Sequence, residues 1–491
     1  MEHQNQSNLS DDAWRYISYL SFKMDCAREQ EETRWGFLKD KAQGHFDDLT
    51  VQQEAKVVEL SKAMPKRVLT KQVNKPKVMV KKDESVSAHG IKWYDLLKQQ
   101  GLPKDTVGPI TVISGYEDGN PKSPLQVKNW LYSLGWKPAT WKFSRDKVTS
   151  EEKKVEQVRY QAGHDREGEL CDSVTRLDKY DPAVTILDGL TVITHRLGFF
   201  KSMLENSITD ESGKSWLKAE IAGLTNTLRF KHSKPLANLP SVGKAWGEEI
   251  RGCLVAPSDD DILIGCDMVS LESMTKRHYM QPHDPDYVEE MSKEGFDEHL
   301  SLAVFAGALT QEDVDDYQAG NRPDVKVIRS KYKPINYSAI YGIGSAKLAR
   351  EMGIPVKEAQ GLIDAYWQRN WSVKTVASEI FTKTTKGKKL WLKQPVSGFW
   401  YSLRNDRDIW STTNQGTGVY CFDKLLSILR DKGVKITATF HDEFISSLLA
   451  EDKGKMDKIL KDSCDLLNDQ LGMNVKMGVD HAYGKSYAEV H

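Results

Sequence analysis

The sequence has almost no net charge, no paired cysteines and no long apolar run. Its 69 Lys and Arg residues are offset by 70 Asp and Glu residues, which gives a formal net charge of -1. A uniformly basic coat for non-specific nucleic-acid binding is therefore excluded, and any basic binding surface must be local. The six cysteines are scattered, with no Cys-x-x-Cys pair and no histidine cluster at zinc spacing. This spacing excludes a zinc enzyme and a disulfide scaffold and is typical of reduced intracellular thiols.

The sequence also predicts neither a secretory leader nor a membrane span. The segment Met1–Leu9 is polar and has no apolar core, so we predict no signal peptide. No apolar run reaches the roughly 18 residues that a membrane span needs. The hydrophobic content of 39% and the charged content of 28% are typical of a soluble globular protein. We therefore expect a cytoplasmic protein without a membrane partner, with roughly three domains of about 150 residues each.

Apolar residues recur at helical spacing over residues 13–62, 119–141, 182–206 and 296–385. Between the first two of these stretches, Lys62–Lys82 contains eight Lys and Arg residues and no acid, with Pro65 and Pro76 as breakers. This composition predicts an extended basic loop. A solvated loop and a site that contacts nucleic-acid phosphates both remain open for it.

Short apolar runs next to acids predict strands in the second half of the chain. Asp261–Asp267 has β-branched residues between two carboxylates and predicts a core strand. Lys435–Phe440 alternates apolar and polar residues, and a second strand-like run, Phe444–Leu448, follows His441-Asp442-Glu443. This order predicts a β-hairpin with acids at its tip. The predicted order is helices, then strands, then more helices, then further strands of the same sheet. This order indicates an α+β chain with a split central domain.

Asp267 and Asp442 each lie at the end of a predicted strand. Either aspartate alone is more often a solvated turn residue, but two carboxylates held together on one sheet repel each other and favour divalent cations between them. Oxygen ligands without thiols suit Mg²⁺, which accepts two carboxylates together with substrate phosphates. Two such ions can activate an attacking hydroxyl and stabilise a leaving pyrophosphate.

A third element strengthens this interpretation. Arg329, Lys333, Tyr337 and Tyr341 are spaced four residues apart, so on a helix they form one slowly turning stripe. The cations at one end suit the phosphates of a nucleoside triphosphate and the rings at the other end suit its sugar and base. An ordinary amphipathic helix is the alternative. Pro334 lies inside the stripe, where it removes a backbone donor and predicts a kink.

The chain resembles family A DNA polymerases, the relatives of bacterial DNA polymerase I, and looks closest to the replicative enzymes of short-tailed bacteriophages. The resemblance rests on three motifs in the family's order: Asp267-x-x-x-x-Glu272, Arg329-x-x-x-Lys333-x-x-x-Tyr337-x-x-x-Tyr341-Gly342, and His441-Asp442-Glu443. Asp297-x-His299 is a further match. The resemblance implies a right-hand polymerase fold, in which helical fingers and thumb flank a palm with an antiparallel sheet. The implied division is a thumb-like helical region over 1–220 with a basic insertion at about 62–120, palm over 221–300, fingers over 301–404 and palm again over 405–491.

The resemblance implies a role for each matching residue. Asp267, Asp442 and the carbonyl of Met268 would bind two Mg²⁺ ions, with Mn²⁺ as a substitute, and Glu443 would be a further catalytic acid. The implied nucleotide-binding residues are Glu272, His299, Arg329, Lys333, Tyr337, Tyr341 and Gly342. The implied contacts to primer–template DNA are Arg229, Asn238, Arg251, Arg407, Gln415 and His441, with Lys66, Arg67, Lys71, Lys75 and Lys77 of the basic insertion as further DNA contacts.

The implied activity is template-directed addition of deoxynucleotides (dNTPs) to a primer 3′-OH. The part of the chain before Asp267 has no recognisable Asp-x-Glu pair on a strand near the start, so we expect no intrinsic 3′→5′ proofreading exonuclease. A separate exonuclease subunit and a processivity factor are then the further partners to expect.

Two alternatives stay open at this point. A repair or bypass polymerase of the same family is compatible with every motif. A single-subunit RNA polymerase shares the palm and the Arg/Lys/Tyr-Gly helix, but it typically has Gly, Met and Ser where this chain has Glu272, Tyr337 and Glu443. A bulky acid at position 272 closes the space that a ribose 2′-OH needs, which favours the DNA polymerase.

Overall fold

The structure is a computed structural model and describes residues 10–146, 149, 151–161, 166 and 168–490. The segment Met1–Leu9, on which the prediction about a signal peptide depends, lies outside the described residues. The chain divides into two compact units: Met1–Asp47 with Arg196–His491, and Asp48–His195. We call them unit 1 and unit 2. The segment that ends at Asp47 therefore belongs with the C-terminal part of the chain, whereas the division predicted from the sequence groups it with the thumb-like region 1–220.

A four-stranded antiparallel sheet lies at the centre of unit 1. Its strands have the order β15-β16-β11-β17, with bounds Asp261–Met268 for β11, Ala438–Phe440 for β15, Glu443–Leu449 for β16 and Val479–Gly484 for β17. The core strand predicted at Asp261–Asp267 and the hairpin predicted around His441-Asp442-Glu443 are both confirmed. The strand expected over Lys435–Phe440 is shorter than predicted.

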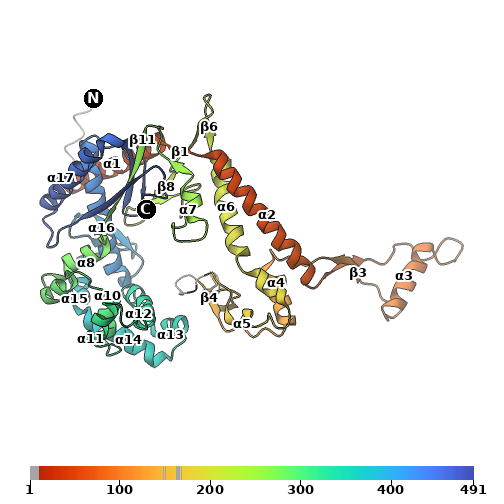
Figure 1. Cartoon of the computed structure of the whole chain (residues 1–491). Coiled ribbons are helices and arrows are strands. Elements are labelled where there is room, and N and C mark those ends of the chain that lie inside the picture. Colours follow the sequence, from red (N-terminus) through yellow and green to blue (C-terminus); the bar gives the residue numbers. More distant parts are fainter. Residues whose placement is uncertain (1–9, 147–148, 150, 162–165, 167, 491) are drawn as a thin grey trace. The chain divides into compact units, whose positions relative to one another are not determined.

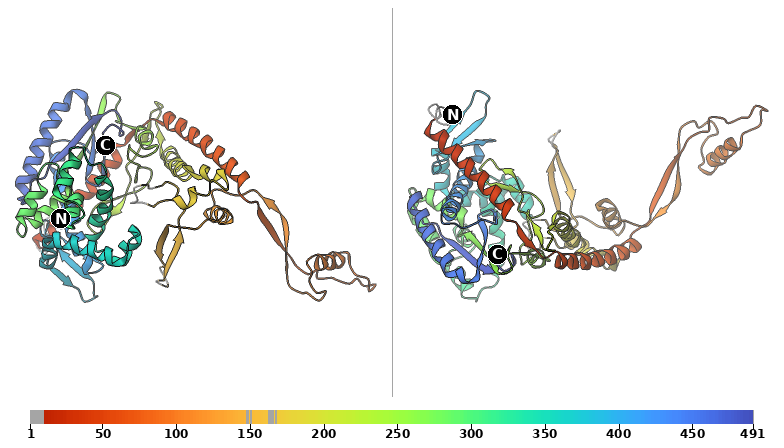
Figure 2. Two further views of the ribbon diagram at one scale, coloured as in Figure 1. Left: turned by 60° about the horizontal axis from the view of Figure 1, so that its bottom comes forward. Right: turned by 90° about the horizontal axis from the view of Figure 1, so that it is seen from above.

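The two faces of this sheet differ because side chains alternate along a strand. On β11, Ile264, Cys266 and Met268 are buried in a core cluster with residues of α16 (Ile409–Asp431) and α17 (Lys453–Leu471). The two helices cover this face of the sheet (Figures 1 and 2). Asp267 has the opposite parity and is exposed on the other face. The hydrophobic pattern of one strand therefore fixes which way the aspartate points.

The predicted helical stretch over residues 13–62 is interrupted. Helix α1 (Asp11–Thr33) is followed by its C-cap residue Arg34, whose φ is +54°. Strand β1 (Trp35–Phe37) then precedes α2 (Lys39–Ala63). Trp35 is completely buried and pairs with Leu217. The predicted helical stretch was too long here, because helical periodicity cannot show that a short segment between two helices pairs with distant strands. The sheet is β10-β1-β7-β6, with bounds Ile208–Thr209 for β6, Ser215–Leu217 for β7 and Leu254–Val255 for β10.

The remainder of unit 1 is mostly helical, as predicted for 296–385. The helices are α7 (Gly247–Arg251), α8 (Leu271–Met280), α9 (Pro285–Met291), α10 (Glu298–Phe305), α11 (Gln311–Gln318), α12 (Val325–Ala339), α13 (Ser345–Met352), α14 (Val356–Arg369) and α15 (Trp371–Glu379). Short strands complete it: β8 (Ile221–Leu224) with β9 (Phe230–His232), and β12 (Thr382–Thr384), β13 (Leu390–Lys393) and β14 (Trp400–Leu403) in one sheet. Single turns of 3-10 helix lie at η3 (Asp406–Asp408) and η4 (Ala450–Asp452).

Helix α12 carries the first three residues of the predicted stripe and runs through Pro334 as one element. Tyr332, Ile335 and Ala339 are buried on its inner face against α10 and α14. Lys333 and Tyr337 are exposed on the other side. The amphipathic pattern therefore presents the stripe to solvent, as expected from its spacing.

Unit 2 contains a two-stranded ribbon where the sequence predicted a basic loop. Strand β2 (Arg67–Val73) pairs with β3 (Ile110–Glu117) along its full length, and α3 (Ala88–Gln99) lies between them in sequence at the far end of the ribbon (Figures 1 and 2). Trp93, Leu97 and Ile110 form a small core there. The prediction of a loop over Lys62–Lys82 is wrong for β2, because its partner strand lies beyond α3 in the sequence and leaves no local signal.

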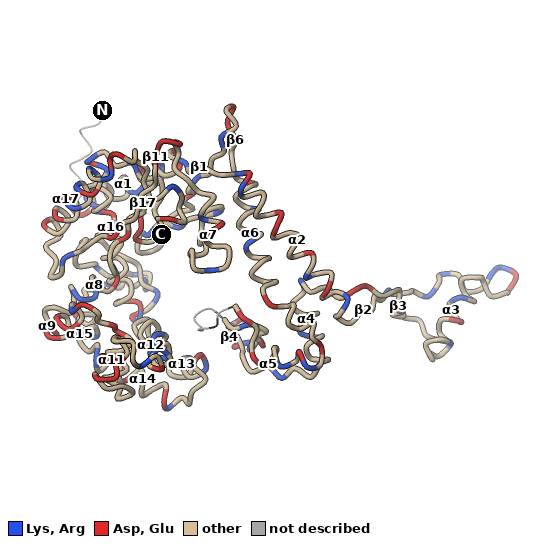
Figure 3. The backbone as a smooth tube through the Cα atoms, viewed as in Figure 1, with Lys and Arg blue, Asp and Glu red and all other residues tan. Residues whose placement is uncertain are grey.

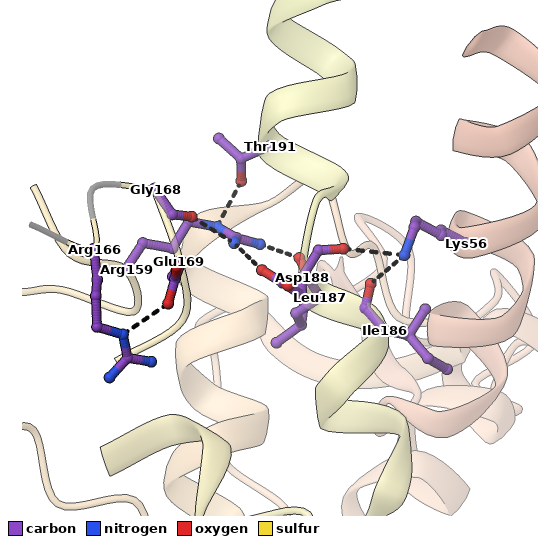
Figure 4. Close-up of polar contacts among 9 residues, drawn as sticks. All are labelled: Lys56, Arg159, Arg166, Gly168, Glu169, Ile186, Leu187, Asp188 and Thr191. Atoms are coloured by element: carbon purple, nitrogen blue, oxygen red, sulfur yellow. Dashed lines mark hydrogen bonds and ion pairs between the residues drawn. The ribbon is translucent and has the colours of Figure 1, made fainter. Parts of the chain in front are cut away.

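The rest of unit 2 surrounds a second core. It comprises α4 (Pro124–Ser133), β4 (Trp141–Arg145), β5 (Glu152–Glu156), α5 (Asp172–Thr175), the 3-10 helix η2 (Pro182–Leu187) and the first turns of α6 (Leu190–Asn206). Figure 4 shows polar contacts that hold the junction of η2 and α6. Arg159 donates to the carbonyls of Leu187 and Gly168 and to Thr191. Lys56 of α2 donates to the carbonyls of Ile186 and Asp188.

Among the described residues, one helical segment is long and apolar enough to cross a membrane, judged by length and composition alone. It is Pro182–Asn206, which has 25 residues and contains an 18-residue window with a mean hydropathy of 1.2. A single such segment is weak evidence for a membrane span. Leu187 and Leu190 within it pack into the core of unit 2.

Candidate active site

The predicted metal-binding aspartates lie together at one end of the central sheet of unit 1. Asp267 is at the end of β11, and Asp442 is in the two-residue turn between β15 and β16. The amide of Met268 donates to the carbonyl of Asp442 over 3.2 Å. This hydrogen bond ties the β11 end to the hairpin tip, so two carboxylates from distant parts of the sequence meet at one site.

The hairpin turn has an uncommon backbone conformation. His441 has a φ of +59°, in the left-handed region that two-residue hairpin turns require. A residue other than glycine is costly there, and such positions cluster at functional sites. The turn leaves His441 exposed, where a residue with a β-branched side chain would fit poorly.

Two further acids flank Asp267 across the strands. Asp267 is the register partner of Glu443 on β16 and of Asp480 on β17. Directly opposed residues point to the same face of a sheet, so three carboxylates share the face that carries the site. Glu443 is 5% exposed and accepts a hydrogen bond from the hydroxyl of Tyr487 over 3.0 Å.

Arg251 is buried, although it was predicted to contact DNA. Its side chain is 5% exposed, its Nε donates to the carbonyl of Pro240 over 2.7 Å, and its guanidinium lies 4.4 Å from the ring centroid of Tyr487. The structure thus places Arg251 behind Tyr487, and through it behind Glu443. In this position its guanidinium lies against Tyr487 and does not project from the surface.

A cavity of about 870 Å³ unites the acids with several predicted DNA contacts. Its lining includes Asp267, Asp442, Glu443, Asp480, Arg229, Asn238, Arg251 and His441. Asn238 is exposed, with a φ of +54°. Arg229 is half-buried, and its Nε has no hydrogen-bond partner among the described residues. Arg229 therefore brings a guanidinium to the wall of the cavity that contains the acids.

A second group of predicted residues surrounds the exposed side of α12. Arg329 donates from Nε to Asp297 over 2.6 Å, while the other oxygen of Asp297 accepts the amides of His299 and Leu300 at the start of α10. Burial alone would raise the pKa of Asp297, but the Leu300 amide and the Arg329 guanidinium outweigh it and the pKa is lowered. Asp297 therefore stays ionised and holds Arg329 against α10.

His299 and Tyr337 meet beside this ion pair. Their ring centroids are 5.6 Å apart, and Nδ1 of His299 lies 3.1 Å from the side-chain amide of Asn336. Burial is the main cause that lowers the pKa of His299, so the imidazole is a neutral hydrogen-bonding group at neutral pH. Lys333 is exposed on the same helix.

Glu272, Tyr341 and Gln415 form a third contact. The hydroxyl of Tyr341 donates to Glu272 over 3.4 Å and accepts from Gln415 Nε2 over 3.4 Å. Burial and the Glu272 carboxylate raise the pKa of Tyr341. Tyr341 lies just beyond the end of α12, and Gly342 follows with a φ of +72°. The last member of the stripe, Tyr341, therefore lies in the turn after the helix, and Arg407 lies next to Gly342.

The five basic residues predicted to contact DNA lie on or beside the ribbon of unit 2. Lys66 and Arg67 form ion pairs with Asp118 and Glu117, at 3.5 and 3.1 Å. Lys71 and Lys77 are exposed and Lys75 is half-buried. Cations and acids are interspersed over both units (Figure 3). The positive charge of the acid-free stretch is therefore partly neutralised by Glu117, at the end of β3, and by Asp118, which follows it.

The donor set around Asp267 suits a hard cation. No group of three or more His, Cys, Asp or Glu side chains arranged to hold a metal occurs within the described ranges. Mg²⁺ does not require such a cage, because it usually takes one or two carboxylates and completes its shell with water and substrate phosphates. Asp267 and Asp442, with oxygen donors only, fit this ion.

Several residues of the site had no usable signal in the sequence. Asp480 and Tyr487 reach it only through the pairing of β17 with β11 and through the segment that follows β17. Asn336 is on the buried side of α12 and outside the four-residue stripe. Asp297 was matched beside His299 without a role, although a carboxylate just before a helical stretch is a typical N-cap and this role could have been predicted.

Comparisons with known proteins identify a family, several relatives and a solved structure with a similar fold. The model of the family described as DNA polymerase family A matches residues 108–489. DNA polymerase I of Lactococcus lactis subsp. lactis (strain IL1403) is 25% identical over 287 residues, which is 55% of this chain and 31% of that protein. DNA polymerase I of Helicobacter pylori (strain J99) is 34% identical over 160 residues, 32% of this chain and 16% of that protein. The chain thus spans less than a third of the length of these two curated relatives.

A solved structure shares the fold. The polymerase domain of Pol1 from M. smegmatis, in complex with DNA primer-template and dNTP, matches with a TM-score of 0.61 and 14% sequence identity, and the match covers 96% of this chain and 70% of that chain. The likeness confirms the predicted α+β, right-hand polymerase fold.

Proposed function

Because the chain belongs to DNA polymerase family A, we propose that it is a template-directed DNA polymerase that adds deoxynucleotides to a primer 3′-OH. The observation that carries the proposal is the juxtaposition of Asp267 with the His441-Asp442 turn, tied by the 3.2 Å hydrogen bond between Met268 and Asp442. The solved polymerase with a similar fold binds DNA primer-template and dNTP, and this supports the same ligands here.

Asp267, Asp442 and the carbonyl of Met268 are the proposed ligands of two Mg²⁺ ions. Bound there, the ions would lower the pKa of the primer hydroxyl and offset charge on the reacting phosphates. Asp267 is exposed on its face of the sheet, where water and substrate can reach it. Glu443, buried and bonded to Tyr487, acts in this scheme as a neighbouring acid that holds the hairpin tip.

Arg329, Lys333 and His299 are the proposed contacts of the triphosphate. Arg329 lies in the 2.6 Å ion pair with Asp297, so its guanidinium is already oriented and a phosphate can share or replace the carboxylate. His299 supplies a hydrogen-bonding ring held by Asn336. Tyr337, 60% exposed, offers a ring for the incoming sugar.

The proposed contacts of the primer–template are Arg229, Asn238, His441, Gln415 and Arg407. The first three line the cavity beside the acids, and the other two lie next to the Tyr341-Gly342 turn. Contacts in the minor groove would find acceptors at similar positions in every base pair. Such contacts check base-pair geometry without reading sequence.

We further propose a replicative role in a bacteriophage, in the host cytoplasm, with proofreading and processivity supplied by separate polypeptides. The support is the resemblance of the three motifs to those of the phage enzymes. A mismatched primer incubated with the purified chain should keep its length. Shortening that survives the change Asp267→Ala would contradict the proposed division of labour.

Primer extension tests the proposed function directly. The purified chain with Mg²⁺ should extend a primer with deoxynucleotides far better than with ribonucleotides, and the change Asp267→Ala or Asp442→Ala should abolish addition while duplex binding persists. Asp315→Ala on α11, an exposed acid of the same unit, is the matched control. Retention of more than about a tenth of the activity by either active-site variant would contradict the assignment, since loss of a metal-binding carboxylate removes stabilisation of the transition state.

A further inference from the structure

Helix α1 contacts the strand that leads into the catalytic hairpin. Strand β15 has β16 on one side and is at the edge of the central sheet. Edge strands present backbone groups that need partners. On β15 the amide of Thr439, three residues before Asp442, donates to Oε1 of Gln30 over 2.7 Å.

Gln30 is fully buried, and both the oxygen and the nitrogen of its side-chain amide form hydrogen bonds. Its Oε1 also accepts the hydroxyl of Thr439 over 3.0 Å, and its Nε2 donates to the carbonyl of Cys26 over 3.1 Å. The bond to Cys26 fixes the orientation of the amide on its own helix. The oxygen is thereby aimed at the strand, which is an arrangement suited to holding one backbone position.

A second side chain of α1 makes a similar contact just before β15. Glu29 accepts the amide of Ile436 over 2.9 Å and the guanidinium of Arg430, on α16, over 2.6 Å. Adjacent residues of α1 therefore hold two amides of the segment that enters the hairpin. Their targets precede Asp442 by six and three residues.

The helix itself is anchored on the same unit. Lys23 forms a buried ion pair with Asp423 of α16 over 2.8 Å, with both side chains at most 2% exposed. At the other end of the helix, Arg15 donates to the carbonyl of Ser397 over 2.7 Å. These contacts make α1 a fixed platform, against which Gln30 can hold β15.

We propose that Gln30 is a positioning residue for the polymerase reaction: through Thr439 it fixes the hairpin tip that carries His441 and Asp442. The inference rests on the proposed function. It predicts that a helix far ahead of the first catalytic acid in the sequence controls turnover without touching substrate or DNA.

The test compares Gln30→Met with Arg15→Met and with the parent protein. Gln30→Met has nearly the same volume but cannot accept the Thr439 amide, whereas Arg15→Met loosens α1 at its other end without affecting β15. Single-nucleotide addition well below each variant's melting temperature should show kcat about 10- to 100-fold lower for Gln30→Met, because small displacements of a catalytic group cost this much. The KM for dNTP and the Kd for primer–template should not change, and Arg15→Met should match the parent.

Hydrogen–deuterium exchange gives a readout that does not depend on activity. The segment 434–449 should exchange faster in Gln30→Met than in the parent or in Arg15→Met. Gln30→Glu should recover much of both properties, because its buried carboxyl group in the protonated form can accept from Thr439 and donate to Cys26. Should Gln30→Met not fold, Gln30→Asn, which withdraws the oxygen by one methylene, takes its place.

The outcomes separate this inference from the proposed function. An inactive parent with faster exchange only in Gln30→Met contradicts the polymerase assignment and leaves the positioning of the hairpin supported. An active parent with equal kcat in Gln30→Met, or an equal loss in Arg15→Met, overturns the inference. Unchanged exchange over 434–449 overturns it as well.

Discussion

Individual side chains around the site carry out distinct tasks that follow from their surroundings. Asp267 is exposed on one face of the sheet, whereas Glu443, its cross-strand neighbour, is buried and bonded to Tyr487. The carboxylate of Asp267 therefore faces solvent, where the proposed metal ions would reach it, whereas the carboxylate of Glu443 is an internal hydrogen-bond acceptor. Glu272 belongs to neither class, because it is exposed and bonded to the Tyr341 hydroxyl.

Glu272 should exclude ribonucleotides. Its carboxylate is held by Tyr341 over 3.4 Å, where it can obstruct a 2′-hydroxyl, and rejection by clash is a strong source of specificity. Glu272→Ala should raise the ratio of ribonucleotide to deoxynucleotide incorporation by about tenfold or more, a change of about 1.4 kcal/mol in discrimination. The ratio of the two kcat/KM values is the measurement. An unaltered ratio would exclude this residue as the sugar filter.

His232 should make stability depend on pH. Burial, the largest cause, and the neighbouring His441 and Lys23 lower the pKa of His232 to about 4, below its ordinary value near 6.5. Between about pH 6.5 and pH 4, His232 is therefore protonated in the unfolded chain and neutral in the folded chain. Stability contributed by the neutral ring is full above pH 6.5 and is lost as the pH falls toward 4, by about 3 kcal/mol.

Urea unfolding at pH 7.5 and pH 5 measures this effect. The parent should lose more free energy of unfolding between the two values than His232→Phe. This variant keeps an aromatic ring beside Phe440, whose ring centroid lies 5.2 Å from that of His232. Equal losses in the two proteins would show that His232 does not titrate as described.

Among the elements, α1 shows where local patterns are informative and where they fail. Spacing of Trp14, Ile17 and Leu20 predicted a helix, and the helix is there. The same spacing gave no sign that the helix packs on α16 and β15, because these partners are about 400 residues away. Helical periodicity reports which face is buried, but the surface that buries it is a property of the tertiary fold.

The ion pair between Lys23 and Asp423 should behave as a buried pair. Removing one partner leaves an uncompensated charge, so Lys23→Met should lower the free energy of unfolding by about 3–5 kcal/mol. The double variant Lys23→Met/Asp423→Leu should recover most of this loss, since apolar replacement of both partners is often neutral or stabilising. Denaturant unfolding of the four proteins gives the coupling. A double variant as unstable as the sum of both single ones would refute the prediction.

At the scale of the whole molecule, the motifs led to most residues of the candidate site, and the pairing of distant strands accounts for Asp480, which they missed. Asp267, Asp442, Arg329 and Tyr337 could be found because strand ends and four-residue spacing are local. Asp480 could not be found, because its place beside Asp267 depends on the register of β17. The ribbon of unit 2 was missed for the same reason. Contacts that close over long loops leave no periodic signal in either segment.

The basic residues of the ribbon should increase processivity. Changing Lys66, Arg67, Lys71, Lys75 and Lys77 to Gln should shorten the product made per binding event and flatten its salt dependence, because phosphate contacts release counterions. Single-nucleotide addition at saturating DNA should remain near the parent value. The measurement is product length under a DNA trap across a salt series.

A matched control uses exposed lysines of unit 1. Lys455, Lys458 and Lys461 on α17, changed to Gln, should leave product length unchanged. Because Lys66 and Arg67 already pair with Asp118 and Glu117, variants of Lys71, Lys75 and Lys77 alone should give most of the effect. Coincident product lengths of parent and variant at every salt concentration would identify the ribbon as a structural element only.

The distance in sequence between Gln30 and Thr439 has a consequence during synthesis. Gln30 and Thr439 are 409 residues apart. At about 5–20 residues per second, a ribosome needs roughly 20–80 s after the synthesis of α1 to complete β15, the strand that α1 contacts. Throughout that interval unit 2 can fold, while Gln30 lacks Thr439 and Lys23 lacks Asp423. The nascent chain is therefore expected to depend on chaperones. If translation stops before β15, the product contains the whole of unit 2, but its helix α1 lacks the contact with Thr439.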